Sequence, residues 1–219
     1  FMTDNGQAGR GARRNGKPKP IFSAGFKTGK GSPFEGGTHV PAFWRWKGIL
    51  GEGVDVPALT AHIDLFQTFC QLADVSIPAN IQEIDGRSLL PLLENPQASW
   101  PDRELFVHVG RWEKGADPNK SQYKSCAVRS QRWRLVNNQL LYDITADPYE
   151  KKDVAAKYPQ VVKRLRKTYD SWWTKAVPLM VNEKAPYAAE HPQVVQRLRK
   201  AYDSWWTKTV PLMVNEDAP

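Results

Sequence analysis

Cysteine is scarce in this sequence, and long apolar runs are missing from it. The two cysteines, Cys70 and Cys126, set no disulfide framework and lack the spacing of a zinc site, so we expect ordinary buried thiols. No apolar stretch is long enough to cross a membrane, and no segment resembles a signal peptide. What is left is a chain of 219 residues, 41% of them hydrophobic, enough for one large domain or a domain and a half with a real core.

Acidic residues are scarce in the first fifty positions. That stretch holds nine Lys or Arg against only Asp4 and Glu35, a net charge of +7, whereas the other 169 residues hold 22 basic and 21 acidic groups. A positive patch confined to one end predicts an anionic ligand there. The stretch has no aromatic interleaving and no nucleic-acid-binding motif, which favours a small or oligomeric anion and argues against nucleic acid.

The first hundred residues predict loops around a few short elements. Residues 6–37 are rich in Gly, Pro, Lys and Arg, so we expect a long loop of the kind that is functional or disordered. The apolar and aromatic run 39–46 favours a strand. Residues 58–74 follow a helical period, and residues 86–93 predict a compact segment that packs against the first domain. The opening residues 1–3 read as the end of a buried strand, which predicts that the chain is a fragment.

The sequence after Pro101 predicts a small antiparallel sheet followed by a helix. Asn137-Asn138 is a plausible tight turn, because Asn tolerates positive φ. A helix should begin with proline at Pro159, and its apolar residues mark one face at helical spacing. The expected strands are 105–109, 125–129, 133–137 and 139–143, and the apolar stripe is Val161, Val162, Leu165, Tyr169, Trp172 and Trp173.

The end of the sequence is a tandem copy. Residues 158–186 recur at 191–219 with an offset of 33 and five differences. Two copies are too few for a solenoid, which needs about three or more units. We expect the first copy to dock on the small sheet, and the second to add little stability and either to stay mobile or to mediate dimerisation. The differing pairs are Tyr158/His191, Lys163/Gln196, Thr168/Ala201, Ala176/Thr209 and Lys184/Asp217.

The segment Asp4-Asn5-Gly6 is the first candidate site. It follows the strand remnant and opens the basic loop, at the carboxyl end of a strand where α/β sheets bind ligands. A carboxylate beside an amide offers the hard oxygen donors that suit Ca²⁺ or Mg²⁺. The same three residues are also common in plain turns, so on its own this segment leaves both interpretations open.

Several further motifs follow Asp4-Asn5-Gly6 in order. They are residues 29–41 (Gly-Lys-Gly-Ser-Pro-Phe-Glu-Gly-Gly-Thr-His-Val-Pro), 62–68 (His-Ile-Asp-Leu-Phe-Gln-Thr), 85–93 (Asp-Gly-Arg-Ser-Leu-Leu-Pro-Leu-Leu), and Leu-Tyr-Asp at 141–143 with Asp-Pro-Tyr-Glu at 147–150. Together with the first segment, these motifs resemble the sulfatase family of the alkaline-phosphatase-like superfamily. The resemblance covers about residues 1–180, and Gln67 stands where the family usually has proline.

The resemblance implies roles for individual residues. Asp4 and Asn5 match a pair of metal ligands, usually for Ca²⁺, and Lys30 matches a lysine that binds sulfate and assists catalysis. The flanking glycines favour that role over a solvated loop cation, because glycine lets backbone approach a ligand closely. We interpret Glu35 as fixing the loop by hydrogen bonds and His39 as structural.

The remaining histidines and one acid are interpreted without a catalytic role. Asp64 and His108 should be structural and His62 should lie at the surface, while His191 belongs to the duplicated tail. His62 and Asp64 lie two positions apart on the expected helix, so they do not share a face.

The family's nucleophile is a formylglycine made from Cys or Ser in a Cys/Ser-x-Pro/Ala-x-Arg motif. Cys70 fails this pattern. Residues 125–129 (Ser-Cys-Ala-Val-Arg) match its short form, but they follow the metal pair, lie in an expected strand and lack the usual Thr-Gly. The formylglycine is therefore expected outside this sequence, together with the other metal aspartates and the sulfate-binding histidines.

The predicted fold is α/β: residues 1–98 as the C-terminal part of a sulfatase-type sheet domain, 99–186 as a small antiparallel sheet with a packed helix, and 187–219 as the copied helix. The full enzyme would hydrolyse a sulfate monoester of a small molecule or saccharide in a periplasmic, extracellular or lysosomal setting. Two alternatives stay open: a phosphatase or phosphonate hydrolase of the same superfamily, and an inactive anion-binding module.

Overall fold

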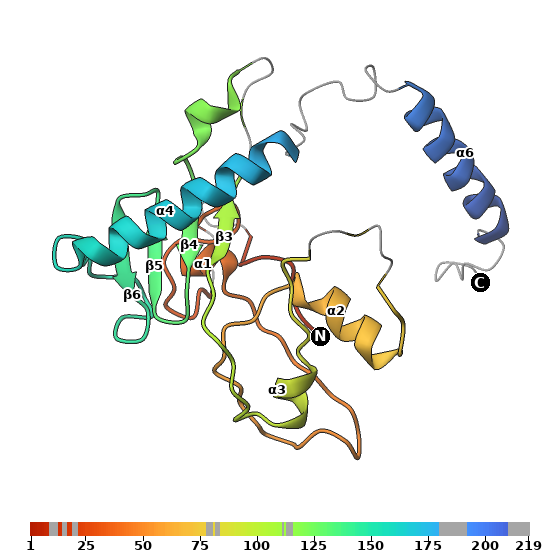
Figure 1. Ribbon diagram of the computed structural model, residues 1–219, viewed down its shortest axis with the longest axis horizontal. Coiled ribbons are helices and arrows are strands. Elements are labelled where there is room, and N and C mark those ends of the chain that lie inside the picture. The colour runs from red at the N-terminus through yellow and green to blue at the C-terminus, as the bar shows by residue number, and fades with distance from the viewer. Residues whose placement is uncertain are drawn as a thin grey trace.

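A four-stranded antiparallel sheet is the centre of the fold (Figure 1). The computed structural model describes residues 1–8, 13–14, 17–18, 22–77, 81, 84–110, 112, 116–179 and 192–209. The strands pair in sequence order, which confirms the expected small sheet. They are β3 (Leu105–His108), β4 (Cys126–Arg129), β5 (Trp133–Val136) and β6 (Leu140–Asp143).

The β5–β6 hairpin is closed by the predicted asparagine turn. Asn137 and Asn138 have φ angles of 49° and 58°, and the Gln139 N–H donates to the Val136 carbonyl at 3.0 Å. Two consecutive positive φ angles define the type I′ turn, whose twist matches that of paired strands. The local sequence therefore sets the register of this hairpin.

Helix α4 (Pro159–Ala176) packs across one face of the sheet, as expected for the first copy (Figure 1). Leu165, Tyr169 and Trp173 are its buried residues and contact the sheet residues that point to this side. Alternate residues of the strands point to the opposite face, where Phe34 packs against Ala127, Val136, Tyr142 and Ile144. Because both faces are covered, every residue of β5 is buried.

The residues before the sheet form short elements. The two-residue strands β1 (Arg13–Arg14) and β2 (Lys17–Pro18) pair within the predicted loop 6–37. The helices are α1 (Glu35–Thr38), α2 (Asp64–Leu72) and α3 (Leu90–Glu94), and 3-10 turns follow at η1 (Pro118–Ser121) and η2 (Val177–Leu179). None of the described helices is long and apolar enough to span a membrane.

The predicted strand at residues 39–46 is wrong. Only Ala42 is paired there, through an isolated antiparallel bridge to Met2. Phe1 and Phe43 complete the contact, with N···O distances of 2.7 and 2.8 Å. A strand needs a ladder of backbone pairs, and within the described part of the chain this run has only the one bridge between Ala42 and Met2.

Helix α2 is shorter than predicted and buries its polar residues. Asp64 and Thr68 are fully buried, whereas Phe66 and Phe69 are 47% and 54% exposed. Thr68 Oγ1 accepts the Leu89 N–H at 2.8 Å, so the polar side of α2 binds the segment 86–93 that was expected to pack here. A Cβ at Gly86 would lie 1.9 Å from the Ile63 carbonyl, which shows how close this approach is. Cys70, expected to be buried, is half-buried.

The copied segment forms a second helix, α6 (Pro192–Thr209), which lies apart from the sheet and from α4 (Figure 1). Its counterpart α4 already covers the sheet face. The division of the chain at 98 and 186 remains a prediction.

Deleting residues 187–219 should leave the melting temperature within about 2–4 °C of that of the whole chain, the shift that 1 kcal/mol causes at this size. The physical reason is that α4 already fills the helix-binding face of the sheet. Self-association, measured by light scattering, should fall. Deletion from residue 159 onward, which removes both copies, is the destabilised control. A large loss of stability in the shorter deletion would mean that α6 belongs to the core.

Candidate functional site

Backbone hydrogen bonds bring the three predicted site residues into one loop cluster. The Gly6 N–H donates to the Gly37 carbonyl at 2.9 Å, and the Lys30 N–H donates to the Gln7 carbonyl at 3.0 Å. The segment that carries Asp4 and Asn5 is therefore tied to the segment that carries Lys30. The two segments lie more than twenty residues apart in the sequence, and the hydrogen bond between Gln7 and Lys30 joins them in the structure.

Glycine is required at three of these contacts. A Cβ at Gly6 would lie 1.9 Å from the Gly36 carbonyl oxygen. Those at Gly36 and Gly37 would lie 2.3 Å from the Lys27 oxygen and 2.1 Å from the Ser32 oxygen. These distances are far shorter than any real Cβ contact, so the glycines of the two motifs permit the backbones to meet. Their requirement is steric, since none of the three has a positive φ.

The side chains at this cluster are available to a ligand. Asp4 and Lys30 are exposed and Asn5 is half-buried. Across the described residues, none of these three side chains has a hydrogen-bond or ion-pair partner. Within the described residues, an exposed carboxylate, a half-buried amide and an exposed ammonium group thus lie on two loop segments that backbone hydrogen bonds join, and these groups suit a metal ion together with an anion.

The donor set partly fits the metal that the family resemblance implies. Asp4 and Asn5 supply two hard oxygens, whereas Ca²⁺ takes 6–8. In the described part of the chain, no group of three or more His, Cys, Asp or Glu is placed to hold a metal ion. Water or other protein groups would have to complete the shell.

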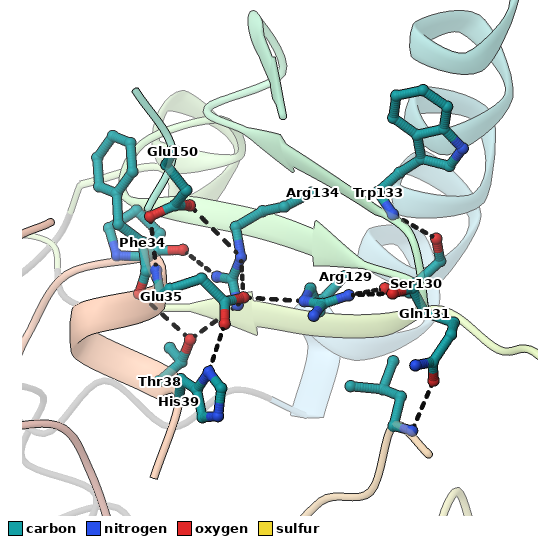
Figure 2. Close-up of polar contacts among 12 residues, drawn as sticks. Phe34, Glu35, Thr38, His39, Arg129, Ser130, Gln131, Trp133, Arg134 and Glu150 are labelled. Atoms are coloured by element: carbon teal, nitrogen blue, oxygen red, sulfur yellow. Dashed lines mark hydrogen bonds and ion pairs between the residues drawn. The ribbon is translucent and has the colours of Figure 1, made fainter. Parts of the chain in front are cut away.

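A buried ion cluster fixes the loop that carries Lys30 to the sheet. Figure 2 shows the Arg134 guanidinium of β5 facing two carboxylates, Glu35 of α1 and Glu150. Arg134 Nη2 lies 2.6 Å from Glu35 Oε1, and Arg134 Nε lies 3.6 Å from Glu150 Oε1. The other oxygen of Glu150 accepts the Glu35 N–H at 2.9 Å. All three residues are at most 3% exposed, so the charges compensate one another away from water.

Other groups complete this ion cluster. Arg129 Nε donates to Glu35 Oε1 at 2.9 Å, and His39 Nδ1 lies 2.8 Å from Glu35 Oε2. Arg134 also donates to the Pro33 carbonyl and, at 2.9 Å, to Thr38 Oγ1. The loop-fixing role predicted for Glu35 and the structural role predicted for His39 match these contacts.

Electrostatics distinguishes the two carboxylates. Burial would raise the pKa of Glu35, but the hydrogen bond from His39 and the charges of Arg134 and Arg129 outweigh it, so the pKa lies well below the ordinary 4.5. Burial raises the pKa of Glu150, which has fewer compensating partners. Burial also disfavours the charged form of Arg134 and so lowers its pKa, an effect that the charge of Glu35 opposes most strongly. Glu35 is therefore the principal counter-ion of the cluster.

Sequence reasoning missed Arg129, Arg134 and Glu150. Their signal was present, because Arg129 and Arg134 sit in apolar strands at positions that point away from α4. It also missed Lys27, whose Nζ donates to Tyr142 OH at 3.3 Å and lies 4.6 Å from the Phe34 ring centre. Lys27 thereby fixes the same loop from its other end.

Cys126 belongs to the core between the sheet and α4. It is 2% exposed, and burial raises the pKa of its thiol. A thiol in this environment is a poor candidate for modification or attack. Its placement agrees with the interpretation of residues 125–129 as a strand.

The other singled-out residues have structural contacts. Asp64 pairs with the guanidinium of Arg103 and accepts the Arg87 N–H at 2.9 Å. His62 is exposed, and its Nε2 lies 2.8 Å from the Thr3 carbonyl. His108 Nε2 lies 2.9 Å from the Ser121 carbonyl, and burial lowers the pKa of its ring. His191 lies outside the described residues.

Comparison with known proteins decides the family. The sequence profile of the N-sulphoglucosamine sulphohydrolase C-terminal family matches residues 30–174, two thirds of the chain. The chain belongs to this family. The match begins at Lys30 and covers the Glu35 loop, the sheet and most of α4.

Curated relatives are sulfatases by name. The "uncharacterized sulfatase YdeN" of Escherichia coli (strain K12) is 33% identical over 197 residues, which cover 76% of this chain and 33% of the relative. Arylsulfatase K of Rattus norvegicus is 31% identical over 144 residues, covering 60% of this chain and 24% of the relative. The chain thus spans a third or less of the length of these relatives.

Solved structures share the fold. The crystal structure of Ps i-CgsB in complex with k-i-k-neocarrahexaose superposes with a TM-score of 0.57 at 27% identity, over 78% of this chain and 35% of that one. A second structure of Ps i-CgsB gives a TM-score of 0.56 at 26% identity. The predicted α/β class, with a small antiparallel sheet and a packed helix, is confirmed.

Replacing Glu35 by Gln should lower the free energy of unfolding by about 3–5 kcal/mol, because it leaves the buried Arg134 without its main counter-ion. Glu150→Gln is the matched control and should lower the free energy of unfolding by about 1 kcal/mol. The loss is smaller because burial disfavours the charged form of Glu150, so removing that charge costs less. Urea unfolding measures both. Equal losses in the two variants would contradict this ranking.

The cost of Glu35→Gln should also depend on pH. The pKa of Glu35 is lower in the folded than in the unfolded chain, so its stabilisation is present above about pH 4.5 and is lost as the pH falls. The stability difference between wild type and Glu35→Gln should therefore shrink below that pH. A difference that grows on acidification would refute the direction of the pKa shift.

Proposed function

We propose that this chain is the C-terminal part of an enzyme that hydrolyses sulfate monoesters. The observation that carries the proposal is the loop cluster, in which hydrogen bonds between glycine-packed backbones join the segment of Lys30 to the segment of Asp4 and Asn5. Family membership supports the reaction class. The net charge of +7 over the first fifty residues supports an anionic substrate.

Lys30 is proposed to bind a sulfate oxygen. Its ammonium is a compact charge that would stabilise the negative charge that develops on the transferring group. Asp4 and Asn5 are proposed as two ligands of Ca²⁺ or Mg²⁺, an ion that would neutralise charge on the same group when bound. The role of Glu35 and Arg134 is to position Lys30 through the loop backbone.

The nucleophile is proposed to lie outside this chain. A formylglycine does not fit the residues present, because Cys126 is sealed in the core and Cys70 lacks the motif. No step is therefore assigned to either cysteine. The chain alone is proposed to be inactive, with two of the metal ligands and the sulfate-binding lysine.

The proposed substrate class is a sulfated saccharide or sulfated small molecule. The structure of Ps i-CgsB in complex with k-i-k-neocarrahexaose supports it together with the proposed reaction class. A periplasmic, extracellular or lysosomal setting rests on the family resemblance.

In an enzyme that contains this chain, Lys30→Ala should lower kcat/KM for an aryl sulfate by about 10²-fold or more, because it removes charge stabilisation from the transition state. Lys47→Ala, at another exposed lysine of the basic end, is the control and should leave kcat/KM unchanged. Asp4→Ala should lose metal affinity as well as activity. Near-normal kinetics for Lys30→Ala would return Lys30 to a solvated loop cation.

The purified chain by itself should not hydrolyse an aryl sulfate, with or without added Ca²⁺. The physical reason is the missing nucleophile and the incomplete metal shell. Lys30→Ala in the purified chain sets the background of the assay. Metal-dependent turnover above that background would refute the proposed division of the active site.

A further inference from the structure

The helix-binding face of the sheet is defined by the contacts that α4 makes with it. Leu165, Tyr169 and Trp173 fill the apolar part and are at most 3% exposed. Trp173 Nε1 donates to Asn119 Oδ1 at 3.0 Å. The apolar contacts fix which side of the helix faces the sheet, and the indole hydrogen bond fixes its position along the sheet.

Charged and polar groups around the rim add further specificity. Asp170 Oδ1 accepts hydrogen bonds from Gln122 Nε2 at 3.0 Å and from Tyr123 OH at 2.6 Å. Arg166 Nε donates to Asn138 Oδ1 at 2.7 Å. A helix that competes for this face would need the same charges at the same spacing.

Helix α6 carries every one of these groups. At the offset of 33 it repeats the arginine, leucine, tyrosine, aspartate and tryptophan positions without change. The repeated contact residues are Arg197, Leu198, Arg199, Tyr202, Asp203, Trp205 and Trp206.

The three positions at which α4 and α6 differ make no contact with the sheet that holds α4. Lys163 is exposed and Ala176 is half-buried at the end of α4. Thr168 Oγ1 donates to the Leu165 carbonyl of its own helix at 3.0 Å. Replacement by Gln196, Ala201 and Thr209 therefore changes none of the contacts that hold α4.

We infer that the sheet face is a site with two alternative occupants, and that α6 of the same chain takes it when α4 is displaced. In the structure, Tyr169 of α4 is 2% exposed and the corresponding Tyr202 of α6 is 57% exposed, so α4 holds the site and α6 does not. This inference concerns the helix pair and does not depend on the proposed activity.

The segment before the helix explains why α4 is preferred. Tyr158 packs on Trp133 with ring centres 4.9 Å apart, and the corresponding residue of the copy is His191. Val154, just upstream, donates its N–H to the Leu141 carbonyl at 2.8 Å, and this bond holds the chain at the sheet a few residues before α4 begins. For α6 to dock, the first copy must loop out, and the entropic cost of such a loop grows only slowly with its length.

A rescue experiment in the whole chain tests this inference. Leu165→Asp places an unpaired carboxylate in the core and should expel α4. The variant should still melt cooperatively, with a melting temperature lowered by about 10 °C, because α6 replaces α4 at the cost of loop closure. Leu198→Asp alone should not change the melting temperature, and the double variant should lose the transition.

Hydrogen exchange shows which helix is bound. In wild type, peptides from residues 159–176 should be protected and those from 192–209 should exchange quickly, and Leu165→Asp should reverse the two. Light scattering of the Leu165→Asp variant should give the mass of a monomer, because α6 then docks within its own chain. The inference is overturned if Leu165→Asp melts like the double variant or if residues 192–209 gain no protection. A dimer of Leu165→Asp would overturn docking within the same chain.

Discussion

The buried pairing of Glu35 with Arg134 is the constraint on which the candidate site depends. The loop that carries Lys30 packs on the sheet through Phe34, which contacts the apolar residues of the face opposite α4. The ion cluster adds a second attachment, and its geometry is demanding because each buried charge must keep its partners. Glu150 closes the cluster by accepting the Glu35 N–H, which also fixes the start of α1. Lys30 thus lies in a glycine-rich loop that the buried charges of the ion cluster attach to the sheet.

The sheet contacts α4 on one face and the loop cluster on the other, because alternate residues along each strand point to opposite faces. On β5, Trp133 and Leu135 contact α4, while Arg134 and Val136 face the loop. One face is therefore an apolar surface that accepts a helix, and the other is a partly charged surface that accepts a functional loop. The contacts of α4 and those of the loop cluster are therefore made on separate faces of one sheet.

What the sequence could predict depended on the range of the interactions. The Asn137-Asn138 turn and the helix from Pro159 are determined by neighbouring residues, and both were predicted. The strand expected at 39–46 and the polar packing of α2 depend on distant partners, so local patterns were misleading there. Asp4, Asn5 and Lys30 were predicted as site residues through family motifs, and their roles stay a prediction. Arg134 and Glu150 were missed because the residue that pairs with them, Glu35, lies about 100 positions away.

Trypsin cleavage measured site by site tests most directly whether the ion cluster holds the loop. Arg134→Met keeps a long side chain but removes the charge that binds Glu35. Cleavage after Lys30 should then become at least about tenfold faster, because it follows the population of the open loop, while cleavage after the exposed Lys47 should not change. Unchanged cleavage after Lys30, or an equal increase at both lysines, would contradict the account.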